Sequence, residues 1–223
     1  PFGLPRTSGS RHLVGPRRFR NVPNAVDPSM ANPSNDEDAN RVSEINRLFD
    51  EFSPKFPDAP EITAETLLSQ SIDGTYMYNS KPVVVVDVRT DLETEVSVIK
   101  NAMTKVAFEK KLQTDSGAFE NKVIVAYCTI GYRSAQFVEK LRSKEKKQLE
   151  AYNLKGSILA WTHAGGGLEE TKTKNKTKKV HVFGKSWDLA ASDCESVYFT
   201  TPALSYVGGF IPDALKPWRW FKK

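Results

Sequence analysis

The sequence predicts an α/β fold with a mostly parallel β-sheet. Two short runs of β-branched residues, at 82–87 (PVVVVD) and 123–127 (VIVAY), lack the alternation of a half-exposed strand, which indicates strands buried on both faces of a sheet. Segments between and after these runs are long enough for the crossover connections that parallel strands need. A chain of 223 residues favours one well-packed domain with extensions over two complete domains.

Two helices are expected ahead of the first buried strand. Apolar residues recur at helical spacing after Asn40, which predicts an amphipathic helical extension over residues 40–58. The residues that carry this pattern are Val42, Ile45, Leu48, Phe49 and Phe52, followed by Pro54 and Pro57. A second, short helix is expected to begin near Thr63, because threonine is a residue type that caps helix N-termini.

Helical character resumes after the second buried strand, over residues 134–147. A charged face of this segment can point outward, while three apolar side chains can face the sheet, namely Phe137, Val138 and Leu141. A last strand is expected near residues 152–154, followed by a turn at Gly156. The core domain is therefore expected to span residues 60–170.

The chain beyond the core domain divides into a loop and an extension. The stretch 171–179 (TKTKNKTKK) is polar and has no hydrophobic period, so it predicts a lysine-rich solvated loop. Residues 180–183 can add a strand. The extension over residues 180–223 is expected to pack on the domain, because three of its aromatic side chains would be costly to expose, namely Trp187, Trp218 and Trp220.

Residues 1–39 are expected to be a disordered or targeting-like segment outside the fold. Residues 1–26 contain five arginines, no lysine and no acidic residue, a composition that resembles an organelle transit peptide. The alternatives are a fragment, a processed product, or translation upstream of a start at Met30.

The composition argues against several classes of protein. The net charge of +5 is concentrated in the arginine-rich start and the lysine run, so no nucleic-acid partner is expected. No apolar stretch is long enough to predict a membrane span. The two cysteines and three histidines show no metal-ligand spacing, so no metal site is expected. Two cysteines also provide no disulfide framework, which favours an intracellular reducing compartment, either the cytoplasm or an organelle.

The candidate active site is the segment CTIGYR at residues 128–133. It follows the buried strand 123–127 directly and precedes a helix that starts near Ser134, so Cys128 lies at the carboxyl end of a strand. Backbone N–H groups of such a loop, together with the first turn of the helix, favour negative charge at the centre of the loop. The segment therefore predicts an anion-binding loop formed by Thr129, Ile130, Gly131, Tyr132, Arg133 and Ser134.

Cys128 is predicted to be a thiolate nucleophile. A helix N-terminus or a nearby cation lowers the pKa of a cysteine from about 8.5. Gly131 lets the backbone curl closely around the sulfur. Arg133 can hold loop carbonyls or an incoming oxyanion through its planar set of donors.

These segments resemble the rhodanese-like family of sulfurtransferases. The resemblance covers roughly residues 60–170 and is carried, in order, by PVVVVDVRT, YCTIGYRSAQFVEKL and LKGSILAW. It implies a three-layer rhodanese-like fold, in which helices flank a mostly parallel five-stranded sheet, with N- and C-terminal extensions. It also implies that Cys128 carries a sulfane sulfur as a persulfide and needs no cofactor.

The resemblance implies roles for further residues and for small partners. Asp87 and Arg89 match a family Asp-Val-Arg segment, in which they tie loops together as structural support. The expected partners are a thiosulfate-like or mercapto-acid donor and a thiol or cyanide acceptor, with a protein acceptor as an alternative. Cys194 is expected to be incidental rather than a resolving thiol, and His163 and His181 are expected to be surface or packing residues.

Two other functions remain open. A rhodanese-like domain can serve as a noncatalytic binding or regulatory module. A phosphatase or arsenate reductase is a weaker alternative, because those relatives resemble Cys-x5-Arg, whereas only four residues separate Cys128 from Arg133 here.

Overall fold

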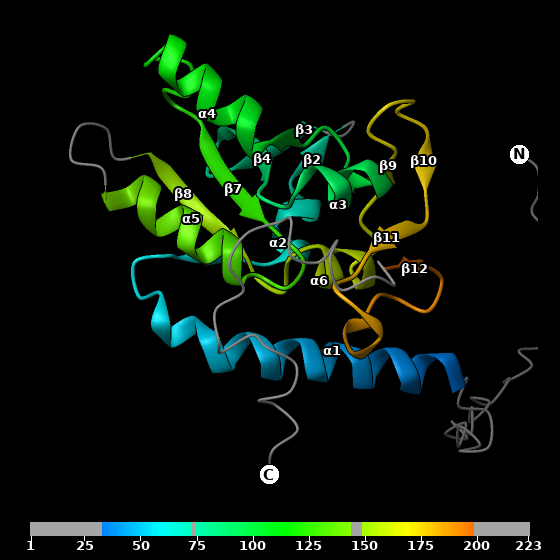
Figure 1. Ribbon diagram of the computed structural model, residues 1–223. Helices are drawn as coiled ribbons and strands as arrows, with labels where there is room; N and C mark the ends of the chain where they lie inside the picture. Colours follow the sequence, from blue (N-terminus) through cyan, green and yellow to red (C-terminus); the bar gives the residue numbers. More distant parts are fainter. Residues whose placement is uncertain (1–32, 73–74, 144–148, 199–223) are drawn as a thin grey trace, which may run out of the picture. The chain divides into compact units, whose positions relative to one another are not determined.

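The computed structural model describes residues 33–72, 75–143 and 149–198 (Figure 1). All elements given below belong to one compact unit within Asn32–Lys223. The predictions for residues 1–32 and for Trp218 and Trp220 lie outside the described residues.

A mostly parallel sheet forms the centre of this unit, which confirms the predicted fold class. Its five parallel strands are β1 (Glu61–Ile62), β8 (Glu150–Leu154), β7 (Val123–Tyr127), β4 (Lys81–Asp87) and β6 (Met103–Thr104), paired in that order. Every residue of β7 is buried, as expected for a strand covered on both faces. Two further strands extend the sheet beyond β4 as antiparallel neighbours, namely β3 (Thr75–Tyr78) and β2 (Ser71–Ile72). They are short and only partly buried, and they have no run of β-branched residues like the one that predicted the central strands. The sequence analysis therefore did not predict them.

Helices flank the sheet on both sides (Figure 1). They are α2 (Ala64–Ser69), α3 (Asp91–Val96), α4 (Lys105–Thr114), α5 (Tyr132–Ser143) and α6 (Ser157–His163). On one side α4 and α5 meet through Phe108 and Phe137, whose ring centroids are 5.8 Å apart. On the other side α6 packs Trp161 against Tyr76 of β3, at 5.7 Å. The predicted helix 134–147 is therefore present as α5, and residues 144–148 lie outside the described residues.

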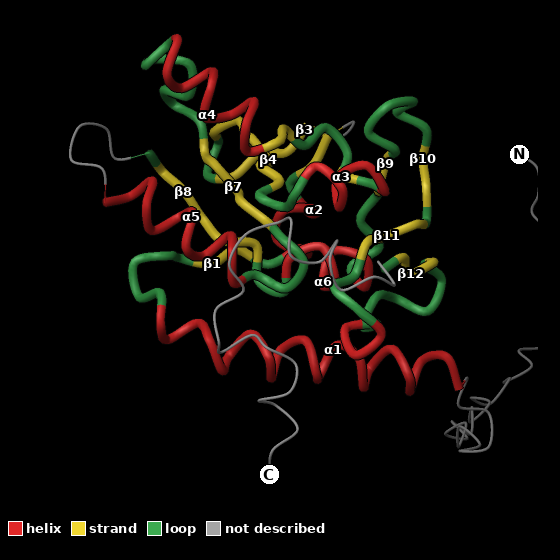
Figure 2. Tube along the Cα trace, viewed as in Figure 1, coloured by secondary structure: helices red, strands yellow, loops and turns green. Residues whose placement is uncertain are grey.

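The amphipathic helix of the extension is α1 (Pro33–Phe52), followed by the 3₁₀ turn η2 (Ser53–Lys55). It begins well before Asn40, so the segment predicted to be disordered to residue 39 is helical from Pro33. A proline at the start and an acidic residue, Asp36, in the first turn are favourable at a helix N-terminus. The first turns contain no apolar period, so the sequence pattern did not extend the predicted helix to Pro33. Figure 2 shows α1 alongside α6, onto which it packs its buried apolar face.

The chain after α6 forms two small sheets rather than a loop and a single strand. Strand β10 (Lys176–Thr177) pairs antiparallel with β9 (Leu168–Glu169), which also pairs with β5 (Val98–Ile99). Strand β11 (Lys179–His181) pairs parallel with β12 (Glu195–Val197). The predicted loop 171–179 therefore contains one strand and the start of another. Backbone pairing and buried side chains such as Val180 hold these strands. Strand β11 overlaps the strand expected at residues 180–183, whereas the polar β10 has no hydrophobic pattern that would predict it.

The described part of the C-terminal extension packs as expected. Val180, Val182 and Ala190 belong to the hydrophobic core, as does Trp187 at the end of the 3₁₀ turn η3 (Lys185–Trp187). Helix α1 holds the extension through Arg41, which donates to the carbonyl of Ala190 at 2.6 Å. Among the helices within the described ranges, none has both the length and the apolar character needed to cross a bilayer.

Candidate active site

The segment from Cys128 to Arg133 follows the carboxyl end of β7, and its last two residues already belong to α5, which begins two residues before the predicted start near Ser134. Cys128 is 2% exposed, residues 129–132 are buried as well, and Arg133 is partly exposed. Two groups donate hydrogen bonds to its sulfur: the Gly131 N–H at 3.2 Å from Sγ and the Ser134 hydroxyl at 3.6 Å. The loop and the first turn of α5 therefore place hydrogen-bond donors at the sulfur.

The electrostatics of the loop favour the thiolate form of Cys128. Burial by itself raises the pKa of this thiol, because it removes water from the charged form. The positive charge of Arg133 and the hydrogen bonds from Ser134 and Gly131 outweigh burial, so the pKa of Cys128 is lower than usual. A lowered pKa is the property that distinguishes a reactive cysteine from a buried, inert one.

The other predicted loop residues divide between polar contacts and packing. Thr129 Oγ1 donates to Glu93 and accepts from Arg133, at 3.4 and 3.2 Å. Ile130 belongs to the hydrophobic core. The ring of Tyr132 packs edge-on against two aromatic rings, Phe52 at 5.5 Å and Phe56 at 4.9 Å. Ile130 and Tyr132 therefore fix the shape of the loop through packing.

Helix α1 packs directly on the loop. Gly131 has φ +116°, and a Cβ placed on it would lie 2.6 Å from Cε2 of Phe49 in α1. The position thus excludes a side chain both through its backbone conformation and through the space that Phe49 fills. The helical extension is part of the wall around Cys128, a role that its amphipathic pattern did not reveal.

The hydrogen bonds of Arg133 go to the side chains of Glu93 and Thr129, whereas the sequence analysis had suggested loop carbonyls or an oxyanion. Its two terminal nitrogens each donate to an oxygen of Glu93, at 2.7 Å. Burial would raise the pKa of Glu93, but Arg133, Arg89 and the Thr90 backbone hold it well below its usual range. Arg133 and Glu93 therefore form an ionised pair beside Cys128.

Glu93 was missed by reasoning from the sequence, although a local signal existed. Thr90 and Glu93 form a capping box at the start of α3, in which the Thr90 N–H donates to Glu93 Oε2 at 3.0 Å. The T-x-x-E pattern predicts such a box. It does not predict that the same carboxylate reaches Arg133, because that contact depends on the packing of α3 against the loop.

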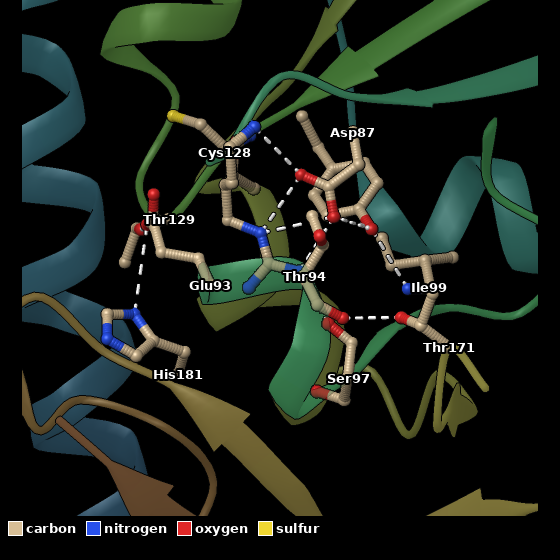
Figure 3. Close-up of polar contacts among 12 residues, drawn as sticks. Asp87, Glu93, Thr94, Ser97, Ile99, Cys128, Thr129, Thr171 and His181 are labelled. Atoms are coloured by element: carbon tan, nitrogen blue, oxygen red, sulfur yellow. Dashed lines mark hydrogen bonds and ion pairs between the residues drawn. The ribbon is translucent and has the colours of Figure 1, made fainter. Parts of the chain in front are cut away.

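Asp87 and Arg89 lie in a buried network that joins several strands (Figure 3). Both side chains are fully buried, and Nη2 of Arg89 lies 2.7 Å from Oδ2 of Asp87. The same Nη2 donates to the carbonyl of Ser97 at 2.7 Å. The hydroxyl of Tyr127 donates to Asp87 at 2.5 Å and accepts from the Ile99 N–H at 3.0 Å. These contacts tie the ends of β4 and β7 to β5, which is the geometry expected of structural support.

His181 of β11 lies next to this site rather than on the surface (Figure 3). Its side chain is 3% exposed, and Nδ1 lies 3.7 Å from Oε1 of Glu93. Burial and the charges of Arg89 and Arg133 outweigh the attraction of Glu93 and lower the pKa of His181 to about 4. Its imidazole is therefore neutral at pH 7. No spacing along the chain links residue 181 to residue 93, so the sequence held no signal for this contact.

The buried imidazole predicts a loss of stability in mildly acidic solution. The pKa of His181 is about 4 in the folded protein and about 6.5 in the unfolded chain, so the unfolded chain binds more protons between these values. The free energy of unfolding should therefore fall by about 2 kcal/mol between pH 7 and pH 5. Urea unfolding of the wild type and of His181→Gln across this range measures the effect. Equal pH dependence in the two proteins would contradict the assignment.

Cys194 lies in a different environment from Cys128. It is half-buried, and its sulfur lies 3.6 Å from an oxygen of Asp193. Burial and the charge of Asp193 raise the pKa of Cys194 to about 11. A neutral thiol is a poor nucleophile, so this environment disfavours the resolving role.

The structure describes no cluster of three or more His, Cys, Asp or Glu side chains within its ranges that could hold a metal ion.

The sheet, the flanking helices and the loop that holds Cys128 define a rhodanese-like domain. Residues 75–164 match the family model described as rhodanese-like domain, so the chain contains a domain of this family. The match includes β4, β7 and the whole of the loop from Cys128 to Arg133.

Two curated relatives and one solved structure each resemble about half of the chain or less. A tRNA uridine(34) hydroxylase of Paraburkholderia xenovorans (strain LB400) is 30% identical over 119 residues, which cover 51% of this chain and 40% of that protein. The corresponding protein of Rickettsia akari (strain Hartford) is 35% identical over 98 residues, 42% of this chain and 36% of that protein. A rhodanese-like domain protein from Staphylococcus aureus is 31% identical, with 46% of this chain and 90% of that chain covered and a TM-score of 0.36. The chain thus spans about two fifths of the length of the curated relatives it matches.

Proposed function

We propose that the protein is a sulfurtransferase that carries sulfane sulfur on Cys128. The observation that supports this proposal is the set of donors around Sγ, namely the Gly131 N–H and the Ser134 hydroxyl, together with the lowered pKa of the thiol. A thiolate held in this way is a nucleophile without a separate general base.

The reaction has two displacement steps. The Cys128 thiolate attacks the outer sulfur of a thiosulfate-like donor, and the S–S bond breaks as sulfite leaves with the electron pair. A mercapto acid with a carbonyl next to its sulfur-bearing carbon loads the same thiolate: the thiolate attacks the mercapto sulfur, the C–S bond breaks, and the electron pair leaves with carbon as an enolate that is then protonated. A thiol or cyanide acceptor then attacks the terminal sulfur of the persulfide and regenerates the thiolate. Cys128 is the covalent carrier in both steps, and no other cofactor takes part.

The ion pair between Arg133 and Glu93 reduces the positive charge that is available to bind an anionic donor. Arg133 is paired with Glu93, and Arg89 is paired with Asp87, so each cation has an anion next to it. An anionic donor therefore depends on the loop N–H groups and the N-terminus of α5 more than on Arg133.

The first test is sulfur loading of Cys128. Incubation with thiosulfate, or with a mercapto acid, should add one sulfur atom to the intact mass of the protein, and cyanide should remove it. The adduct should be absent in Cys128→Ser. It should persist in Cys194→Ser, the matched control, since the pKa of Cys194 is raised to about 11.

A second candidate function comes from the curated relatives. Proteins 30% and 35% identical to this chain over 119 and 98 residues carry the name tRNA uridine(34) hydroxylase. In this alternative the chain takes part in modifying tRNA, and the expectation that it has no nucleic-acid partner would be wrong. Incubation of tRNA with the protein under air, followed by mass spectrometry of the nucleosides, would reveal an oxygen atom added to uridine.

The outcomes of these experiments separate the functions. Sulfur loading without a change in tRNA supports the sulfurtransferase. Oxygen added to uridine in a Cys128-dependent manner supports the second candidate. A protein that does neither with any common donor fits the noncatalytic module, and hydrolysis of an aryl phosphate dependent on Cys128 would indicate a phosphatase.

A further inference from the structure

Ser157 has an unusual backbone conformation at the start of α6. It has φ +51° and follows Gly156, which has φ +65°. This left-handed region suits glycine, whereas a residue with a Cβ adopts it at a conformational cost. Ser157 is also fully buried. A buried serine in this conformation indicates that its hydroxyl makes contacts that hold it there.

The hydroxyl of Ser157 contacts the backbone of Cys128. Its oxygen accepts a hydrogen bond from the Cys128 N–H at 3.0 Å and donates to the carbonyl of Leu154 at 3.3 Å. Neighbouring N–H groups of α6 support the same loop, since Ile158 donates to the Cys128 carbonyl at 3.3 Å. The start of α6 therefore supports the first residues of the loop.

The same hydroxyl also lies next to the donor that reaches the sulfur. Ser157 Oγ is 3.4 Å from Ser134 Oγ, and Ser134 Oγ lies 3.6 Å from the sulfur of Cys128. Ser157 has one hydroxyl proton, which can go either to the Leu154 carbonyl or to Ser134 Oγ. When it goes to Ser134, the contacts form a path from the Cys128 amide through two hydroxyls to the Cys128 sulfur. Hydrogen bonds in such a chain polarise one another, so a charge on Sγ strengthens each of them.

We propose that Ser157 is a positioning residue for Cys128, because its hydroxyl holds the Cys128 amide and orients the Ser134 hydroxyl toward Sγ. The effect of Ser157 on the Cys128 thiol is independent of the proposed function, whereas its effect on sulfur transfer rests on that function. Ser157 touches neither the donor nor the acceptor. It acts through Ser134 and through the backbone of the loop.

The test is a titration of the Cys128 thiol in a Cys194→Ser background. Thiolate absorbance in the ultraviolet, taken as the difference from Cys128→Ser, gives the pKa of this thiol without a reagent that must enter the buried site. In Ser157→Ala the pKa should rise by about 0.5 to 1 unit, so the thiolate fraction below the pKa falls about 3- to 10-fold. Ser157→Gly should show the same rise, although glycine adopts this backbone conformation freely.

Two controls separate the hydroxyl from the backbone. Ser80 also has a positive φ, +62°, but is exposed, so Ser80→Ala should leave the pKa of Cys128 unchanged. Ser134→Ala should raise this pKa, and adding Ser157→Ala to it should have a smaller effect than in the wild type, because the path is then already broken.

The proposal is overturned if folded Ser157→Gly and Ser157→Ala keep the wild-type titration, or if only one of them shifts it. Loss of folding in Ser157→Ala leaves Ser157→Gly to decide the result. A wild type that shows the predicted titration but cannot be loaded with sulfur would reject the proposed function and retain the role of Ser157.

Discussion

Replacing Arg89 with methionine is expected to lower the free energy of unfolding by about 3–5 kcal/mol. Arg89 is fully buried, and its guanidinium donates to both oxygens of Asp87 and to the Ser97 carbonyl. Methionine fills similar space but leaves the Asp87 carboxylate buried beside the Tyr127 hydroxyl without its cation. Urea unfolding at neutral pH measures the loss.

Arg142 provides the matched control for this prediction. It lies exposed on α5, and Arg142→Met should change stability by less than about 0.5 kcal/mol. If Arg89→Met and Arg142→Met have the same effect, the buried network does not support the fold as described.

Replacing Gly131 with alanine should destabilise the protein by about 4 kcal/mol, from backbone strain together with a clash. The added Cβ would lie 2.6 Å from Cε2 and 2.9 Å from Cδ2 of Phe49, and φ is +116° at this position. The ring of Phe49 is fully buried, so it cannot move aside without disturbing the core. Thermal or urea unfolding measures the loss, and the pKa of Cys128 should rise as the loop opens.

Gly165 separates the two causes of this effect. It also has a positive φ, +75°, but a Cβ there would meet no atom within 4 Å. Gly165→Ala should therefore cost only the strain of the left-handed backbone, about 1–2 kcal/mol. Phe49→Leu should relieve part of the cost of Gly131→Ala in the double variant. Equal costs at the two glycines would show that Phe49 does not confine the loop.

The contact with Phe49 changes the interpretation of the N-terminal extension. Its apolar period predicted an amphipathic helix, which the structure contains as α1, packed on the domain. The period did not predict that Phe49 and Phe52 would face the loop of Cys128. Removal of α1 should therefore impair sulfur loading as well as stability, because Gly131 and Tyr132 lose the side chains against which they pack.

The central strands and the loop of Cys128 could be predicted from the sequence because their signals are local. A strand buried on both faces requires a run of apolar residues, and β4 and β7 have such runs. A loop that curls around an anion needs glycine and the start of a helix directly after a strand, and Gly131 and α5 provide both. The short strand β10 and the polar start of α1 lacked such a local signal.

By itself, the sequence determined the fold class and the order of strand, loop and helix around Cys128, since each depends on neighbouring residues along the chain. Only the tertiary structure decided what surrounds the sulfur. Glu93 forms an ion pair with Arg133, and the imidazole of His181 lies 3.7 Å from Glu93. The hydroxyl of Ser157 accepts a hydrogen bond from the Cys128 N–H. These partners are far apart in the chain, and the packing of α3, β11 and α6 around the sheet brings them together. The charge and hydrogen bonds at a buried atom depend on distance in space, which periodicity along the chain does not encode.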